Sequence, residues 1–125
     1  MNVMVKEVLL VAAGGAVGSA MRYLVGKVAG QLFTGSFPVG TFIANIVGCF
    51  VIGVLTGLVS SNVVSPQMKL LLVTGFCGGF TTFSSFANES ISLMSGGQIA
   101  LAILYIALSV AIGLFATFVG IKVVS

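Results

Sequence analysis

Residues 75–86 read Gly-Phe-Cys-Gly-Gly-Phe-Thr-Thr-Phe-Ser-Ser-Phe, and this stretch decides the fold. Three glycines fall within its first five residues, and each glycine inside a helix costs about 1 kcal/mol relative to alanine. Hydroxyl residues then alternate with phenylalanines. Two interpretations are open on composition alone. The stretch is either a glycine-rich packing face whose hydroxyls bond back to their own helix, or a point where a helix breaks.

The sequence on either side of this stretch is strongly apolar. Of 125 residues, 58% are hydrophobic and 6% are charged, and the mean hydropathy is +1.27. A soluble domain is about 25% charged because its surface faces water. The composition therefore predicts an integral membrane protein. In lipid, a broken helix is tolerated only where its backbone is buried in protein or lines a cavity, and its free amides and carbonyls can bind ions there.

The positions of the charges divide the chain into four spans. Residues 28–68 and 90–121 carry no charged side chain, and a transmembrane helix needs roughly 20 mainly apolar residues. We expect an all-α membrane protein with one transmembrane domain and spans near residues 7–30, 37–60, 67–95 and 98–121, the third of them broken at mid-membrane. Ser65 followed by Pro66 is typical of a helix start, which places the beginning of the third span.

Four helices pack into a solid bundle with little room for an aqueous path, so transport would require an oligomer. Pairs of glycines four residues apart let helices approach closely in lipid. The chain has four such pairs: Gly14 with Gly18, Gly26 with Gly30, Gly53 with Gly57, and Gly75 with Gly79.

The basic residues are almost evenly divided between the two sides of the membrane. With four spans, Lys6, Lys69 and Lys122 share one side, and Arg22 with Lys27 belongs to the other. An excess of Lys and Arg in cytoplasmic loops normally fixes orientation. A chain without this excess inserts both ways, so the sequence predicts dual topology and an antiparallel homodimer.

A few polar residues inside the predicted spans are candidates for function. Asn45 lies near the middle of the second span, where its amide serves either to join helices or to bind an ion. Arg22 lies toward the end of the first span, from which it can snorkel to the interface. Glu89 is the only acidic residue well inside a span.

Further hydroxyl residues extend this set of candidates. Tyr105 and Ser109 are four residues apart and share a face of the fourth helix. Together with Asn45 they predict a polar track through the dimer that also includes Thr41, Ser84 and Ser85.

These motifs resemble those of the Fluc family of bacterial fluoride channels. The resemblance is carried by residues 75–86, by Asn45 in Asn-Ile-Val-Gly, and by Arg22 in Gly-Ser-Ala-Met-Arg-Tyr. It implies a dual-topology dimer in the bacterial plasma (inner) membrane that exports cytoplasmic fluoride passively through two pores. It also implies that Asn45, Phe83 and Phe86 line the fluoride path. A structural sodium ion at the subunit interface would be held by the main-chain carbonyls of Gly78 and Thr81.

The side chains suit an anion path on chemical grounds. Fluoride is strongly hydrated, so a pore has to replace water with hydrogen-bond donors. Asn45 offers two N–H groups and each hydroxyl offers one, while phenylalanine rings have electropositive edges. No Lys or Arg lies in the middle of a predicted span, which favours the weak, multiple sites that conduction needs.

Two other classes stay open on the sequence. A small dual-topology multidrug/proton antiporter needs a carboxylate deep in the membrane. Only Glu89 is placed for this role, and the chain has no Trp to line a drug pocket. A structural subunit whose motifs only pack helices is the second class. An enzyme is not expected, because the sequence offers neither a nucleophile–base pair nor a set of metal ligands.

Dual topology is tested by labelling. We expect a cysteine label in the loop near Gly96 to be accessible from both sides of the membrane in one population. Adding two lysines to one side should trap one orientation and lower activity, and co-expression of the opposite trap should restore it. If every label reports the same side, the antiparallel dimer is wrong.

Overall fold

The computed structural model describes residues 2–125, and these residues are helical apart from short connections. In chain order the elements are α1 (Val3–Leu32), α2 (Val39–Ser60), α3 (Pro66–Lys69), the π-helix η1 (Leu70–Cys77), α4 (Gly78–Phe80), α5 (Phe83–Ser95) and α6 (Ile99–Val123). Within residues 2–125, four helical stretches are long and apolar enough to cross a membrane, the third of them being Pro66–Ser95. The prediction of an all-α protein with four spans is therefore confirmed.

The helix ends follow from local capping. α1 begins at Val3, earlier than the expected start of the first span near residue 7. The side chain of Asn2 accepts a hydrogen bond from the Met4 amide and caps the helix. α2 begins at Val39, directly after Pro38, whose ψ of 76° is not helical. The third span begins as predicted: Ser65 accepts a hydrogen bond from the Met68 amide, and Pro66 follows in the first turn.

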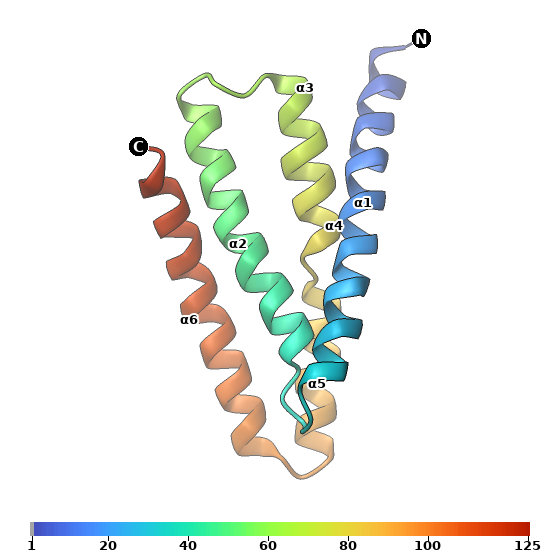
Figure 1. Cartoon of the computed structure of the whole chain (residues 1–125), viewed down its shortest axis with the longest axis vertical. Coiled ribbons are helices and arrows are strands. Elements are labelled where there is room, and N and C mark those ends of the chain that lie inside the picture. The colour runs from blue at the N-terminus through green and yellow to red at the C-terminus, as the bar shows by residue number, and fades with distance from the viewer. Residues whose placement is uncertain (1) are drawn as a thin grey trace.

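The four spans run alternately up and down (Figure 1). Both termini and the connection from α2 to α3 lie at one end of the molecule, as the span count predicts. The two other connections lie at the opposite end. Each of them contains a glycine with positive φ, Gly35 at 115° and Gly97 at 82°, a conformation that costs glycine little because it has no Cβ.

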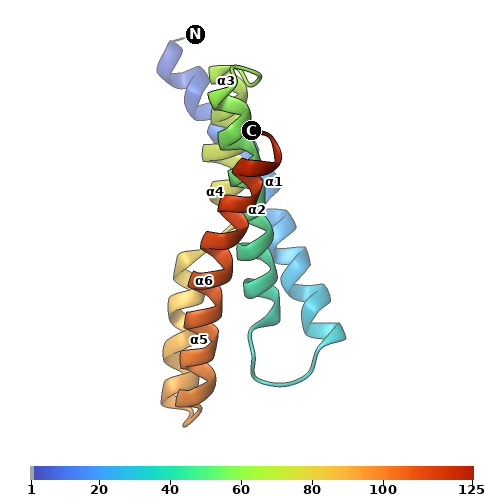
Figure 2. The ribbon, with the colours of Figure 1, turned by 90° about the vertical axis from the view of Figure 1, so that its left-hand side faces the viewer.

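The third span changes its packing partner part-way along. Its first half, η1 and α4, packs against α1, whereas α5 packs against α6. Figure 2 shows α5 beside α6, with the end of α1 lying apart from both. α2 contacts all parts of the arrangement, most extensively α6. The interruption between α4 and α5 thus lets one span serve two helix–helix interfaces.

Backbone atoms form the interface between α1 and the first half of the third span. A Cβ at Gly14 would collide with the Leu71 carbonyl oxygen and the Phe76 amide, and one at Gly18 with the Phe76 carbonyl oxygen. Gly75 approaches α1 from the other side, where a Cβ would lie 2.8 Å from the Val11 carbonyl oxygen. Glycine at these positions therefore brings the two helices into backbone contact.

The predicted glycine pairs differ in the room that they leave for a side chain. A Cβ at Gly53 would collide with the Thr117 carbonyl oxygen of α6, and one at Gly57 with the side chain of Val124, the residue that follows α6. In contrast, a Cβ at Gly26 or Gly30 would meet no atom within 4 Å. The spacing of glycines alone does not distinguish these cases.

This difference gives a matched pair of variants on one helix. Gly14→Ala should lower the free energy of unfolding by about 1–3 kcal/mol, because the added methyl overpacks the interface with η1. Gly30→Ala should be neutral or stabilising, since alanine is the better helix former and its methyl finds open space. Thermal unfolding of the purified proteins in detergent measures both. Equal midpoints for the two variants would contradict the packing described here.

Candidate functional site

The break in the third span lies at two threonines. Thr81 has φ −89° and ψ 158°, and Thr82 has φ −149° and ψ 120°, so both are extended. Gly78 and Gly79 stay helical in α4. The break predicted within residues 75–86 is therefore present, and it lies at the threonines. Close packing explains Gly79, where a Cβ would lie 2.6 Å from the Gly15 carbonyl oxygen.

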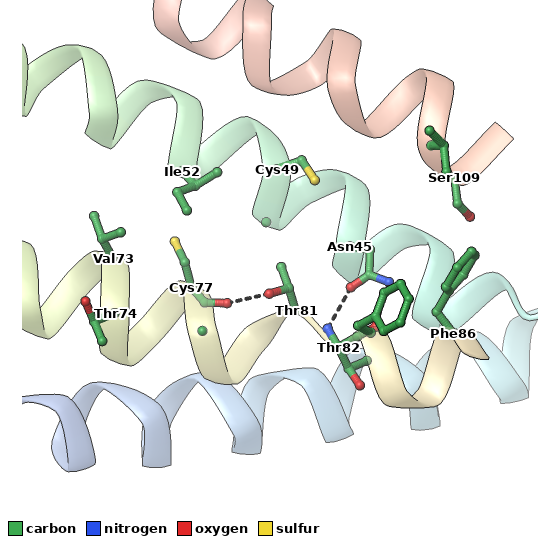
Figure 3. Close-up of a pocket in the computed structure, with 14 residues that line it drawn as sticks. Asn45, Cys49, Ile52, Val73, Thr74, Cys77, Thr81, Thr82, Phe86 and Ser109 are labelled. Atoms are coloured by element: carbon green, nitrogen blue, oxygen red, sulfur yellow. Dashed lines mark hydrogen bonds between the residues drawn. The ribbon is translucent and has the colours of Figure 1, made fainter. Parts of the chain in front are cut away.

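Asn45 on α2 satisfies the backbone of the break. The Thr82 amide donates to Asn45 Oδ1 over 2.8 Å (Figure 3). Asn45 Nδ2 donates in turn to the Thr82 carbonyl oxygen over 3.1 Å. This places Asn45 in the helix-joining role that the sequence left open. Of its two N–H groups, one is engaged with Thr82 and the other is left for a further acceptor.

Thr82 is a residue that sequence reasoning missed. Besides its backbone contacts with Asn45, its Oγ1 accepts a hydrogen bond from the Ser85 amide over 3.1 Å and so caps α5. Ser84 Oγ lies 3.3 Å from the same hydroxyl. The signal was present, since threonine is a favoured N-cap residue and Thr82 directly precedes a segment that reads as helix.

Arg22 contacts the other side of the break. Its Nε donates to the Gly79 carbonyl oxygen over 3.0 Å, and the side chain is part-buried. Arg22 thus contacts the backbone at the end of α4. The reason is that α1 lies so close to α4 that a carbonyl is within reach of the guanidinium.

Two further carbonyls lose their helical partners at the break. In a continuous helix the Gly78 carbonyl would accept from the Thr82 amide, but that amide donates to Asn45. The Thr81 carbonyl would accept from the Ser85 amide, which instead donates to Thr82 Oγ1. Gly78 is exposed on the surface of the single chain, and Thr81 is half-buried.

An open groove of about 560 Å³ lies beside the break (Figure 3). Its polar and aromatic lining residues are Asn45, Thr74, Thr81, Thr82, Ser109, Phe83 and Phe86, and Cys49, Cys77, Gly78 and Val110 line it as well. None of its lining residues, all within the described range 2–125, is charged. The groove thus brings together six of the residues selected from the sequence.

The two phenylalanines lie on one face, as their spacing predicts. The ring centroids of Phe83 and Phe86 are 5.7 Å apart with 47° between the planes. Phe86 in turn lies 5.2 Å from the ring of Tyr105. Phe83 is 79% exposed in the single chain. Its ring therefore stands at the open side of the groove, while Phe86 reaches back to the buried cluster around Tyr105.

Ser109 has an unusual environment in the groove. Its Oγ is buried and finds no hydrogen-bond partner among residues 2–125. Most serines in long helices satisfy their hydroxyl by bonding to the carbonyl four residues earlier, as Ser90 does here to Phe86. A buried hydroxyl without a partner is rare in native proteins and points to a water, ion or ligand at that position.

Glu89 forms a second polar cluster behind the groove. Thr41 Oγ1 donates to Glu89 Oε2 over 2.8 Å, and the fully buried Tyr105 hydroxyl donates to Glu89 Oε1 over 2.9 Å. A hydroxyl has one hydrogen to donate, so neither Thr41 nor Tyr105 offers a free donor in this arrangement.

The predicted polar track is therefore divided into two parts. Asn45 and Ser109 line the groove, whereas Thr41, Tyr105, Ser84 and Ser85 do not. The parts meet along α6, where Tyr105 and Ser109 are one turn apart.

Fold and site together define a class: a multi-pass membrane protein of four spans whose third span is interrupted beside an uncharged polar groove. Within it the chain belongs to the CrcB-like protein, Camphor Resistance (CrcB) family, whose model matches residues 9–121. A Flavobacterium psychrophilum relative named fluoride-specific ion channel FluC is 48% identical over 117 residues, covering 93% of this chain and 94% of the relative.

Other relatives carry the same name. One from Rhizobium etli is 48% identical over 118 residues, which cover 94% of both chains. One from Chlorobium phaeobacteroides is 49% identical over 115 residues, covering 91% of this chain and 89% of the relative.

The contact between Asn45 and Thr82 is tested by a change of one atom. Asn45→Asp replaces the Nδ2 donor by a carboxylate oxygen facing the Thr82 carbonyl, which leaves two acceptors opposed in a part-buried site. We expect a loss of about 1–3 kcal/mol in the free energy of unfolding. Asn88→Asp, at an exposed position of α5, is the control for the added charge. Equal thermal midpoints for the two variants would show that the contact between Asn45 and Thr82 does not stabilise the broken helix.

Proposed function

We propose that this chain is one subunit of a fluoride-selective channel, which exports cytoplasmic fluoride passively across the bacterial plasma membrane. Membership of the CrcB-like family and the names of its relatives support this function. The observation that carries it is the buried, unpartnered hydroxyl of Ser109, which faces an uncharged groove together with Asn45, Phe83 and Phe86.

The chemistry of the groove suits a weakly held anion. Ser109 offers one unused O–H, and Asn45 offers the N–H that Thr82 leaves free. The rings of Phe83 and Phe86 add electropositive edges. Because no lysine or arginine lines the groove, fluoride binds at several weak sites and is not trapped at one.

The groove is completed by a second copy of the chain. Phe83 is 79% exposed in the single chain, and Gly78 on the same groove is exposed as well. Both lie in the middle of a span, where the open side of the groove faces either lipid or protein. The near balance of basic residues between the two sides supports an antiparallel partner, so that two such grooves form two pores.

A sodium ion between the subunits fits the break. The carbonyls of Gly78 and Thr81 have lost their helical donors, and carbonyl oxygens are suitable ligands for a hard cation. Broken helices commonly bind sodium through such released carbonyls. Residues 2–125 contain no group of three or more His, Cys, Asp or Glu side chains that would hold a metal. When bound, the ion would offset the repulsion between facing carbonyls.

The antiporter interpretation requires Glu89 to exchange protons with the transport path. Here Glu89 accepts hydrogen bonds from Thr41 and Tyr105 and does not line the groove. Family membership and this geometry both favour the channel.

The test is anion efflux from liposomes that contain the purified protein, with fluoride and chloride compared. Phe83→Ile and Phe86→Ile should each lower fluoride efflux by at least about tenfold, equivalent to about 1.4 kcal/mol on the permeation barrier. The reason is that isoleucine fills space without an electropositive edge. Phe115→Ile is the matched control, because Phe115 is 67% exposed on α6 and lies outside the groove. Full fluoride efflux through correctly assembled Phe83 and Phe86 variants would remove them from the path.

A further inference from the structure

Within residues 2–125, Arg22 is the basic side chain that hydrogen-bonds to the backbone beside the break. Gly15, Ser19 and Arg22 share one face of α1, because they are three or four positions apart. This face lies against α4. A Cβ at Gly79 would lie 2.6 Å from the Gly15 carbonyl oxygen and 3.1 Å from Ser19 Oγ. The distance between the two helices is therefore set by backbone contact. Arg22, one turn beyond Ser19, is held within reach of the Gly79 carbonyl.

The hydrogen bond from Arg22 occupies the Gly79 carbonyl near the end of α4. Arg22 Nε donates to the Gly79 oxygen over 3.0 Å. The neighbouring Gly78 carbonyl loses its helical donor to Asn45, and the Thr81 carbonyl loses its donor to the cap of α5. The Gly79 carbonyl is thus satisfied by a side chain, while the carbonyl of Gly78, directly before it, and that of Thr81, two residues after it, are released.

We propose that Arg22 is a positioning residue of the cation site, which holds the end of α4 through the Gly79 carbonyl so that Gly78 and Thr81 present their carbonyls to sodium. This inference rests on the sodium site proposed above. A free Gly79 carbonyl would compete for the ion or rotate the peptide planes beside it, so the affinity for sodium depends on the hydrogen bond.

Two variants of Arg22 separate the hydrogen bond from the charge. In Arg22→Gln the side-chain amide nitrogen stands the same number of bonds from Cα as the Nε of arginine, so the donor stays and the charge is lost. Arg22→Met has a similar length and no donor. Lys27→Met is the control for loss of a basic residue, because Lys27 lines the same 380 Å³ cavity as Arg22 on α1.

The experiment measures the thermal midpoint of the purified protein in detergent as sodium replaces N-methylglucamine at constant ionic strength. We expect the sodium concentration that gives half of the stabilisation to rise at least about tenfold in Arg22→Met, the scale of one lost hydrogen bond. Arg22→Gln and Lys27→Met should stay close to the wild-type value. A purely structural role would lower the midpoint at every sodium concentration and leave the half-saturating value unchanged.

Each outcome decides the inference. Equal half-saturating concentrations for Arg22→Met and Arg22→Gln would overturn it. A tenfold rise of the half-saturating sodium concentration in Arg22→Gln would also overturn it, because the charge would then matter and the hydrogen-bond donor would not. This second result can be obtained even if Arg22→Met does not fold. Absence of any sodium effect on the wild type would reject the ion site together with this inference. Fluoride efflux from liposomes tests the channel function separately.

Discussion

The pair of hydrogen bonds between Asn45 and the backbone of Thr82 is the contact on which the rest of the site depends. Inside a bilayer no water is available for unpaired amides and carbonyls, and each one costs several kcal/mol. A break in a span therefore persists only where protein groups replace the lost helical bonds. Asn45 does this for both backbone groups of Thr82, and in doing so it fixes α2 against the third span.

The change of packing partner creates the groove. η1 and α4 follow α1 along an interface of backbone contacts, while α5 turns to α6. Where the two directions separate, Phe83, Phe86 and Ser109 surround a space that no helix of the same chain fills. An uninterrupted third helix packed along α1 would carry its phenylalanines away from α6. The aromatic face and the unpartnered hydroxyl would then not meet.

The sequence predicts the spans well and the contacts poorly, for a physical reason. Spans follow from the long uncharged segments, a property of each segment by itself. The glycine-rich stretch indicated a break but not its position: Gly78 and Gly79 stay helical, Gly79 packs closely against α1, and Thr81 and Thr82 adopt the extended conformation. The partners of Glu89, 48 and 16 residues away along the chain, and the reach of Arg22 to Gly79 depend on interhelical distances. No local pattern encodes those distances.

The interruption of the third span also places two helix ends with partial charges of opposite sign close together in a chain that has few charged side chains. The amides at the start of α5 sum to about half a positive elementary charge, and the carbonyls that end the helical segment before it sum to about half a negative one. The 13 residues of α5 are enough for aligned peptide dipoles to add. An anion and a cation can therefore be favoured a few residues apart in a groove lined by no ionised side chain. Such fixed partial charges do not titrate, so the electrostatic character of the break is independent of pH.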